Sequence, residues 1–328
     1  MKINDVCALI LLSTLSVYGA AQPFEVPKPN FYGQIQAQAA WHDYADYTTD
    51  IARAELGVKG NVPTNLIVAH YTLEAEYSES LTDVSQDNDL IVREANIVLM
   101  TKEYGGAFIG TGTTGAWKDL YSKVDIFDSN NMERHSDNLL FGGKRYASNQ
   151  LALITPKFNH FQFKAAISTP LEYNETDSDI LGFRGLYNRN NFSFAINQAL
   201  TAKEMLNGAT KDSSRTLVSA SYLWDEWYIG AVAEFDYNAP FGRRNVYALS
   251  TRYTLNDTKF SLGYQYADWF DYQDNESLVI ANVNHPLNNH FTIYSEAAFY
   301  GDSDKAKAIT PQQKAKGNNY NLGLIVSF

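Results

Sequence analysis

Apolar and polar residues alternate one by one over much of the chain. The clearest case is the C-terminal end, where every second residue from Tyr320 to Phe328 is apolar and Asn321, Gly323 and Ser327 stand between them. Successive side chains of a β-strand point to opposite faces, so this segment is predicted to form a strand with one apolar face. The same period of two recurs around residues 34–42, 67–77, 161–168, 227–236, 260–266 and 291–299.

The connections between these segments alternate between short and long. Short connections rich in Asn, Asp, Gly and Pro, the residues of tight turns, lie at 60–65, 102–105, 157–160, 188–191, 225–226, 256–257 and 286–289. Long polar connections lie at 43–51, 78–90, 113–143, 169–179, 200–214, 238–244, 268–277 and 301–318. Together they separate 16 candidate strands, with both chain ends on the side of the short turns.

This pattern predicts an all-β fold, a 16-stranded antiparallel transmembrane β-barrel. Outer-membrane barrels have an even strand number, short periplasmic turns, long extracellular loops and apolar residues facing outward. A soluble sandwich would not sort its connections by length to opposite ends. The inward face carries Gln, Glu, Asn, Ser, Thr and Arg, which cost several kcal/mol each if buried dry and unpaired. Sixteen strands leave an aqueous channel that removes this cost, so the pattern indicates a solvated passage.

Tryptophans fall near the ends of the predicted strands. Trp224 and Trp227 flank a short turn, and Trp41 and Trp269 lie next to long connections. Amphipathic rings favour lipid–water boundaries, so we expect these residues in belts at the two rims. Past residue 21 no apolar run approaches the roughly 18 residues of a membrane helix, which excludes a helical membrane protein but not a barrel.

The first 21 residues have the layout of a secretory signal peptide. Lys2 precedes a mostly apolar stretch over 6–17, and Gly19-Ala20-Ala21 offers small residues for cleavage. We therefore expect a signal peptide over 1–21 and a single barrel domain over 22–328. Cleavage would remove Cys7, the only cysteine, and leave a mature chain without disulfides or thiol chemistry.

The connection from Thr113 to Gly143 is the longest by a wide margin, and loops of this size usually have a function. Folded into the barrel, it would narrow the pore. Its acidic candidates for the constriction are Asp119, Asp125, Asp128, Glu133 and Asp137. The basic candidates on the barrel wall are Arg53, Lys59, Arg93, Arg145, Arg184, Arg215 and Arg252.

Opposed acidic and basic groups would create a transverse field that favours polar solutes and sets ion preference. The alternative for each residue is a solvated loop charge or a local ion pair. The chain has 26 Lys and Arg against 37 Asp and Glu, a formal net charge of −11. This balance and the acidic loop predict a weak cation preference. It also argues against nucleic-acid binding, which needs a basic face.

Several segments resemble the Gram-negative general diffusion porins. Phe31-Tyr32-Gly33 resembles the first strand of that family, residues 56–60 (LGVKG) its second, and residues 145–158 (RYASNQLALITPKF) the strand after the constriction loop. Phe328 on its alternating strand, with Tyr320, resembles the signal read by the outer-membrane assembly machinery. The resemblance implies a homotrimer in contact with outer-membrane lipid and lipopolysaccharide. It also implies passive diffusion of ions and small hydrophilic solutes past the third extracellular loop.

Two other functions are compatible with the sequence. Inward aromatic side chains at Tyr228 and Tyr294, with Trp117 in the long loop, could form a stacking track for sugars or oligosaccharides. The barrel could instead serve as an adhesin or an enzyme.

Catalytic and cofactor motifs are weak in this chain. Residues 110–115 match G-x-G-x-x-G, but no strand–helix–strand unit surrounds them. The six histidines have no metal-ligand spacing, and nothing marks a nucleophilic serine. We expect no catalytic residue, no metal and no cofactor.

Overall fold

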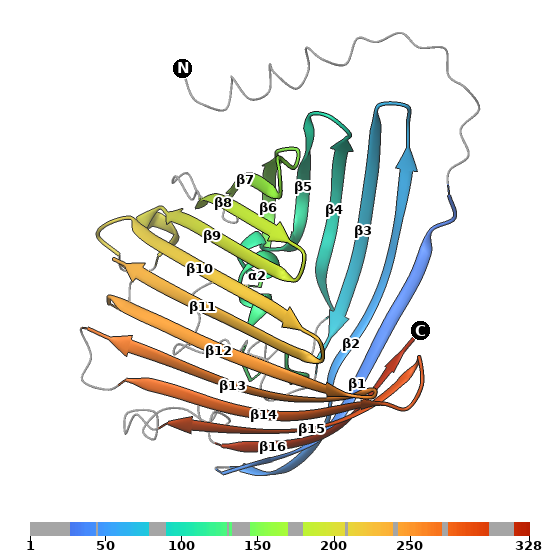
Figure 1. The fold of residues 1–328 in the computed structure, drawn as a ribbon, viewed down its shortest axis with the longest axis vertical. Helices are drawn as coiled ribbons and strands as arrows, with labels where there is room; N and C mark the ends of the chain where they lie inside the picture. The colour runs from blue at the N-terminus through green and yellow to red at the C-terminus, as the bar shows by residue number, and fades with distance from the viewer. Residues whose placement is uncertain are drawn as a thin grey trace.

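The chain forms a closed barrel of antiparallel strands (Figure 1). A computed structural model describes residues 27–43, 45–78, 90–129, 131–132, 145–169, 180–206, 209–238, 242–270, 275–301 and 318–328. The strands are β1 (Asn30–His42), β2 (Ala45–Pro63), β3 (Ile67–Tyr77), β4 (Ile91–Thr101), β5 (Gly105–Thr113), β6 (Tyr146–Ile154), β7 (Phe161–Ser168), β8 (Ile180–Arg189), β9 (Phe192–Thr201), β10 (Ser213–Trp224), β11 (Trp227–Tyr237), β12 (Arg244–Leu255), β13 (Thr258–Trp269), β14 (Glu276–Pro286), β15 (Phe291–Gly301) and β16 (Asn319–Ser327).

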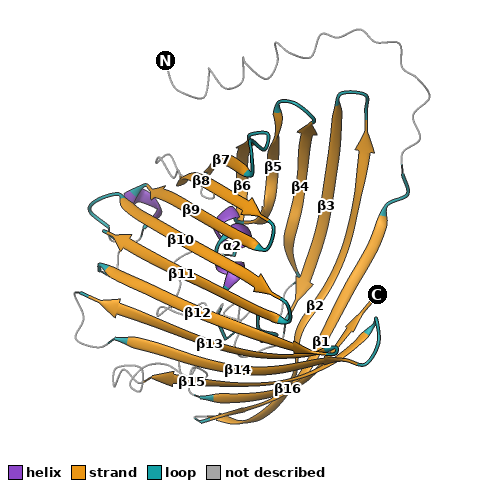
Figure 2. Cartoon of the chain, in the orientation of Figure 1, coloured by secondary structure: helices purple, strands orange, loops and turns teal. Residues whose placement is uncertain are grey.

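Each strand pairs with its neighbours in sequence, and β1 pairs with β16 to close the sheet. The predicted 16-stranded antiparallel barrel is confirmed. Closure satisfies the backbone amides without an exposed sheet edge, which a barrel in lipid requires. Among the described residues, no helix is both long and apolar enough to cross a membrane. Short helical pieces, α2 (Gly115–Asp119), η1 (Tyr121–Lys123) and η2 (Lys203–Met205), lie in the connections (Figure 2).

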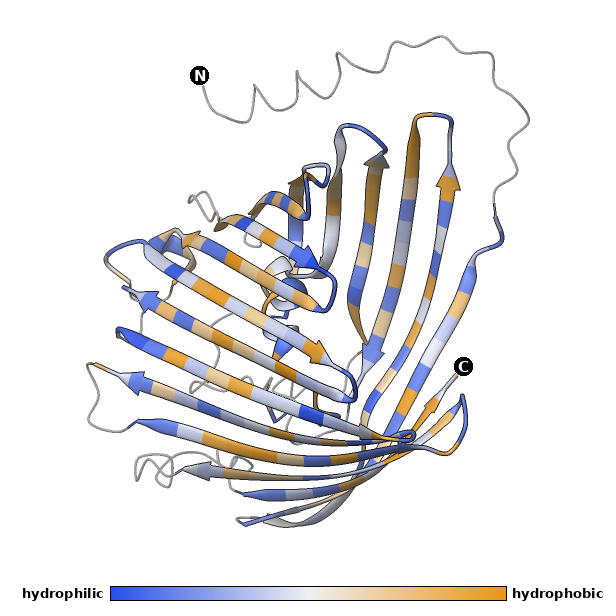
Figure 3. Cartoon of the chain, viewed as in Figure 1, coloured by the Kyte–Doolittle hydropathy of each residue, from blue (hydrophilic) through white to orange (hydrophobic). Residues whose placement is uncertain are grey.

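The alternating pattern sorts side chains between the outside and the inside of the barrel. On β11, Trp227 and Ile229 are exposed on the outer surface, whereas Val232, Glu234 and Asp236 are buried on the inner side. Figure 3 shows the same banding along the other strands. Every second residue of a strand therefore lies on the outer surface, and these residues are mostly apolar, as is typical of a barrel surface in contact with lipid.

The short turns use residues that tolerate a left-handed backbone. Asn190, Asp225 and Asn256 have φ angles of 50°, 49° and 53° at three of these turns. Asn and Asp adopt this conformation more readily than other residues with a Cβ, so the sequence fixes tight hairpins at this end.

Two expectations about the opposite end were wrong. The predicted long connection at 43–51 is mostly strand, because β2 begins at Ala45 and pairs with β1. Trp269 lies on the inner side of β13, where the Arg244 guanidinium stacks 5.0 Å from its ring centroid, so it is not part of the outer aromatic belt. Trp41, Trp224 and Trp227 are exposed on the outer face, as expected.

The C-terminus completes the closure of the barrel. The backbone N–H groups of Gly33 and Phe328 each donate to the other residue's carbonyl oxygen at 3.0 Å. The Phe328 ring covers Gly33, and a Cβ on Gly33 would lie 2.5 Å from the ring. Tyr320 is exposed on the outer face of β16, with its ring 5.7 Å from that of Trp41. Both predicted assembly-signal residues thus lie on the closing strand pair.

Candidate functional site: the constriction of the barrel

The long connection between β5 and β6 turns into the barrel, where α2 lies inside the ring of strands (Figure 2). Thr114 caps the helix, its hydroxyl oxygen accepting from the Trp117 N–H at 3.4 Å. Trp117, Leu120, Tyr121 and Val124 follow at the spacing of one helical face, and all are buried. The local sequence therefore gives the loop a short helix with an apolar side.

The apolar side of the loop packs against an apolar part of the barrel interior, which we call the apolar seam. Leu120, Tyr121 and Val124 are fully buried in it. The wall contributes Leu186, Leu217, Val232, Val246, Leu278 and Ile280, all from inward positions of β8 to β14. The expectation of a polar inner face is therefore wrong on this part of the wall. Where the loop covers them, these strands carry apolar side chains on the inner face as well as on the outer face, with a few polar side chains between them that contact the loop.

Glycines let the loop approach the wall closely. Gly230 and Gly263 occupy inward positions under the loop. A Cβ on Gly230 would collide with the Lys123 carbonyl oxygen, and one on Gly263 would lie 2.6 Å from the Phe127 ring. The Tyr228 and Ser250 hydroxyls donate to the Lys123 and Val124 carbonyl oxygens at 2.8 and 2.6 Å. Wall and loop are thus matched in shape and in hydrogen bonding.

One end of the loop is held by ion pairs. Asp119 contacts Lys164 Nζ at 2.9 Å and Arg184 Nη1 at 2.5 Å, with both cations on the inner wall. Burial raises the pKa of Asp119, but the two positive charges outweigh it and hold the pKa below its usual range. The structure brings together Asp119 and Arg184, both predicted from sequence. Lys164 was not predicted, although the alternation along β7 places its side chain on the inner face.

The other end of the loop is held by neutral donors. The Asp128 carboxylate accepts from the Asn282 and Asn284 amides at 2.9–3.0 Å. Glu296 accepts from the Ser129 hydroxyl and from the Asn131 amide at 2.8 Å. In the described part of the chain, amides and hydroxyls rather than cations contact these two carboxylates. Glu296 was not singled out in the sequence because only the position of the loop shows its role.

A third contact joins the middle of the loop to β11. The Tyr121 hydroxyl donates to Glu234, and burial together with this carboxylate raises the pKa of Tyr121 well above its usual range. Arg215 and Arg244 pair with Asp236 at 2.5 and 2.9 Å. Arg215 was predicted as a wall cation, whereas Glu234, Asp236 and Arg244 were missed. All three residues occupy inward positions in the alternation of their strands, and this was the signal that could have identified them.

A mixed-charge wall formed by residues of β2, β3 and β4 and the residue before β6 carries four of the five remaining predicted cations, and Arg252 lies on β12. Arg93 pairs with Glu76 at 2.9 Å, and Arg53 lies 3.5 Å from Glu55. Four cations, Arg53, Lys59, Arg93 and Arg145, share this wall with five described carboxylates on inward positions, Asp50, Glu55, Glu74, Glu76 and Glu94.

Four of the predicted wall cations stack on aromatic rings, among them Arg93 at 4.8 Å from the Tyr146 ring. Lys59 lies 4.6 Å from the Tyr32 ring, Arg145 5.3 Å from that of Tyr146, and Arg252 5.3 Å from that of Tyr228. In the loop, the Asp125 N–H donates to the Tyr121 carbonyl oxygen at 2.9 Å. Glu133 and Asp137 lie outside the described residues.

Among the described loop residues, Lys123 has a pKa shifted toward neutrality. Burial lowers its pKa to about 8, with Asp119 raising and Lys164 lowering it by smaller amounts. A depressed lysine pKa means that the docked loop binds fewer protons than a released one. Docking should therefore strengthen as the pH rises through about 8 toward the ordinary lysine value.

We expect cation preference to increase between pH 7 and 9, because Lys123 loses its charge in this range. The measurement is the reversal potential in a salt gradient at several pH values. Lys123→Met should remove this pH dependence, and Lys118→Met, at an exposed position of the same loop, should leave it in place. Equal pH dependence in both variants would contradict the assignment.

Nothing in the described residues points to a metal or nucleotide site. No three His, Cys, Asp or Glu side chains there gather closely enough to hold a metal ion. The glycine-rich run at 110–115 begins in β5 and enters a helix of five residues within an antiparallel sheet. It lacks the parallel strand–helix–strand unit that a dinucleotide site needs.

The comparisons with known proteins agree with this architecture. No curated protein matches the chain. The anion-selective porin from Comamonas acidovorans superposes with a TM-score of 0.74 at 16% identity, over 92% of this chain and 99% of that one. OmpF of Salmonella typhi in complex with daunomycin gives 0.74 at 14%, over 92% and 97%.

OmpT of Vibrio cholerae in its trimer form gives a TM-score of 0.66 at 15% identity, over 93% of this chain and 100% of that one. At these identities the solved structures establish the fold alone. The family model described as Gram-negative porin matches residues 8–306, which is most of the chain. The chain, a closed 16-stranded barrel with a loop folded into it, therefore belongs to the Gram-negative porins.

Proposed function

We propose that this chain is a weakly selective diffusion porin, whose passage runs between the inward-folded loop and the wall of β1 to β6. Porins form channels in the outer membrane through which small solutes diffuse passively, and this chain is such a channel. Ions and small hydrophilic solutes are the class that a polar passage admits. The observation that carries the weak selectivity is the near balance of four cations and five carboxylates on the mixed-charge wall, with a small excess of negative charge.

The constriction charges support a small preference for cations. Asp119 is neutralised by Lys164 and Arg184, so this part of the loop adds little net field. Amides and hydroxyls rather than cations contact the carboxylates of Asp128 and Glu296, so among the described residues no wall cation offsets them at this end of the loop. We assign the constriction to these residues and to the mixed-charge wall. No catalytic role is assigned to any residue.

The sugar-track alternative is not favoured by the aromatic side chains. Trp117 and Tyr294 are only 5% and 2% exposed, so neither offers a ring face to a passing solute. The Tyr294 hydroxyl donates to Gln38 at 3.0 Å and accepts from the Gln36 amide at 2.7 Å. These rings support the loop and the wall instead. No observation favours an adhesin or an enzyme.

Selectivity is tested by a reciprocal pair of substitutions on the mixed-charge wall. Arg93→Gln should shift the reversal potential in a salt gradient toward cations, and Glu74→Gln should shift it toward anions, because each removes one charge of a single sign from the wall. The double variant should return close to the parent. Glu226→Gln, in an exposed turn, serves as the control. Strong anion preference of the parent channel, or no shift in either variant, would refute the proposal.

The family and the similar solved structures also support a proposal for how the protein assembles. We propose a homotrimer, as in the trimer form of OmpT, in contact with outer-membrane lipid and lipopolysaccharide. Residues 1–21 act as a cleaved signal peptide and lie outside the described residues. Phe328, with Tyr320, is the signal for the outer-membrane assembly machinery.

A further inference from the structure

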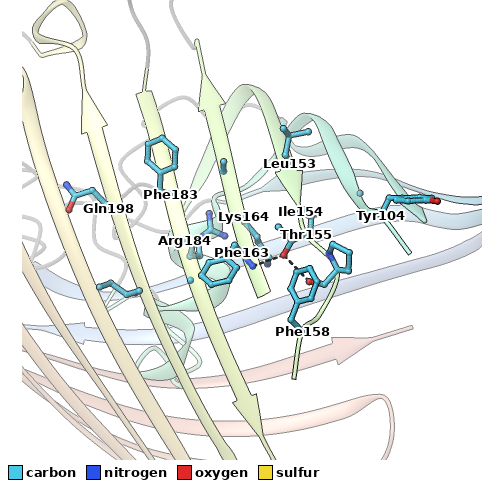
Figure 4. Close-up of a pocket in the computed structure, with 15 residues that line it drawn as sticks. Tyr104, Leu153, Ile154, Thr155, Phe158, Phe163, Lys164, Phe183, Arg184 and Gln198 are labelled. Atoms are coloured by element: carbon cyan, nitrogen blue, oxygen red, sulfur yellow. Dashed lines mark hydrogen bonds between the residues drawn. The ribbon is translucent and has the colours of Figure 1, made fainter. Parts of the chain in front are cut away.

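An apolar groove of about 650 Å³ lies on the outer surface of the barrel between β5 and β9. Figure 4 shows the aromatic side chains that border it, Phe158, Phe163, Phe183 and Tyr104, with Leu153 at one edge. Phe163 and Phe183 are each about half exposed. The volume falls within the range of roughly 300–1,000 Å³ typical of sites for a single small ligand.

Beside the groove, the strand β6 ends and residues 155–157 are not in a strand before the bridge Phe158↔Phe161. β6 and β7 pair only from Gln150↔Ser168 to Ile154↔Lys164. The chain then leaves the sheet at Pro156, which lacks an N–H for the ladder. It turns back through Asn159 and His160, whose φ angles are 45° and 82°. Gly185 and Ala165 leave the floor of the groove without large side chains.

The two ends of the groove differ in polarity. At the end nearer mid-wall, the Gln198 amide donates to Ser214 at 2.9 Å and its oxygen accepts from Thr216 at 2.6 Å. This end therefore presents no unsatisfied polar group to a ligand. At the periplasmic turns, Lys157 is exposed between Pro156 and Phe158, which both line the groove. Lys102 is also exposed there, next to Glu103, so the two turns together carry a positive surplus.

We propose that this groove binds one phospholipid of the periplasmic leaflet, with an acyl chain between the phenylalanine rings and the phosphate beside Lys157. The outer face of a porin barrel is covered by lipid, so an open apolar groove there is filled by acyl chains. Lys157 attracts the headgroup to the periplasmic end, and the hydrogen-bonded Gln198 amide at the other end offers the headgroup no partner. The lipid therefore lies with its phosphate at the periplasmic end. A basic residue near the leaflet surface attracts anionic headgroups, so phosphatidylglycerol is the preferred ligand.

The test is native mass spectrometry of the purified full barrel after exchange into detergent containing phosphatidylglycerol or phosphatidylcholine. The parent should retain one phosphatidylglycerol per chain. Gly185→Leu fills the groove floor and should abolish retention. Ala231→Leu makes a similar change at an exposed outer position of β11 away from the groove, and should have no effect.

The headgroup is tested separately from the chain. Lys157→Glu should weaken phosphatidylglycerol retention by about fivefold or more, the effect of a single basic residue near an anionic lipid, and leave phosphatidylcholine unchanged. Lys259→Glu, the same charge change near another short turn, is the control. Circular dichroism of each variant verifies the β-barrel.

Three results would overturn the proposal. The first is equal lipid retention by the parent and Gly185→Leu. The second is equal retention of both lipids by the parent, which would remove the headgroup contact. The third is a change of oligomeric state in Gly185→Leu with lipid unaffected, which would assign the groove to a second copy of the chain. Channel conductance should be unchanged in all variants that fold, so failure of the lipid site is distinguishable from failure of the channel.

Discussion

A Leu120→Asp variant is expected to keep its barrel and to conduct larger, noisier currents than the parent. Leu120 is fully buried in the apolar seam between the loop and β8–β14. Truncating such a leucine costs about 2–5 kcal/mol, and placing a carboxylate there adds its desolvation. The strand ladders do not involve Leu120, so the loop rather than the barrel should give way. Release of the loop widens the passage.

Single-channel recording in planar bilayers measures this effect, and liposome swelling with sugars of increasing size measures the width of the passage. Leu287→Asp is the matched control, because Leu287 is exposed in a short turn and does not belong to the buried residues of the apolar seam. Its conductance should equal that of the parent. A folded Leu120→Asp barrel with parent-like conductance would show that the seam does not hold the loop.

The barrel was predictable because its signal is repeated in every strand. Alternation such as that from Trp227 to Phe235 depends only on which side faces lipid, and this rule acts locally along each strand. The Asp and Asn residues of the short turns add an independent signal, since Asp225 and Asn256 adopt the left-handed backbone in the structure. Strand number and direction follow from these local rules.

The constriction was only partly predictable because its contacts join distant segments. The pairing of Asp119 with Arg184 was within reach, since both residue types were expected at the pore. The contacts of Asp128 with Asn282 and Asn284 depend on where the loop ends inside the barrel. The alternation also did not reveal the apolar seam, because Val232 and Val246 lie on the inner face of their strands, where polar residues were expected. The helical spacing of Trp117, Leu120, Tyr121 and Val124 was the one signal that the loop itself needs an apolar partner.

Gly33→Ala is expected to impair closure of the barrel during refolding in detergent. The added Cβ would lie 2.5 Å from the Phe328 ring and 2.9 Å from the Glu55 carbonyl oxygen, so both the ring and the backbone would have to move. Overpacking of this kind typically costs about 1–3 kcal/mol. Gly185→Ala is the matched control, since a Cβ there meets only ordinary contacts at 3.4–3.8 Å. The measurement is the folded fraction, from the mobility shift of unheated samples on gels.

Comparing refolding with assembly in cells separates steric closure of the barrel from the assembly signal that we propose for the C-terminus. Refolding in detergent needs no assembly machinery, so a defect of Gly33→Ala there reports steric closure alone. Phe328→Ala removes the ring that covers Gly33, and should refold in detergent but fail to reach the outer membrane in cells. Gly33→Ala combined with Phe328→Ala should recover much of the lost refolding, because the ring that collides with the Cβ is gone. If Phe328→Ala reaches the outer membrane normally, the ring serves closure only. If the double variant refolds no better than Gly33→Ala, the collision with the Glu55 carbonyl oxygen is the dominant obstacle and the ring is not.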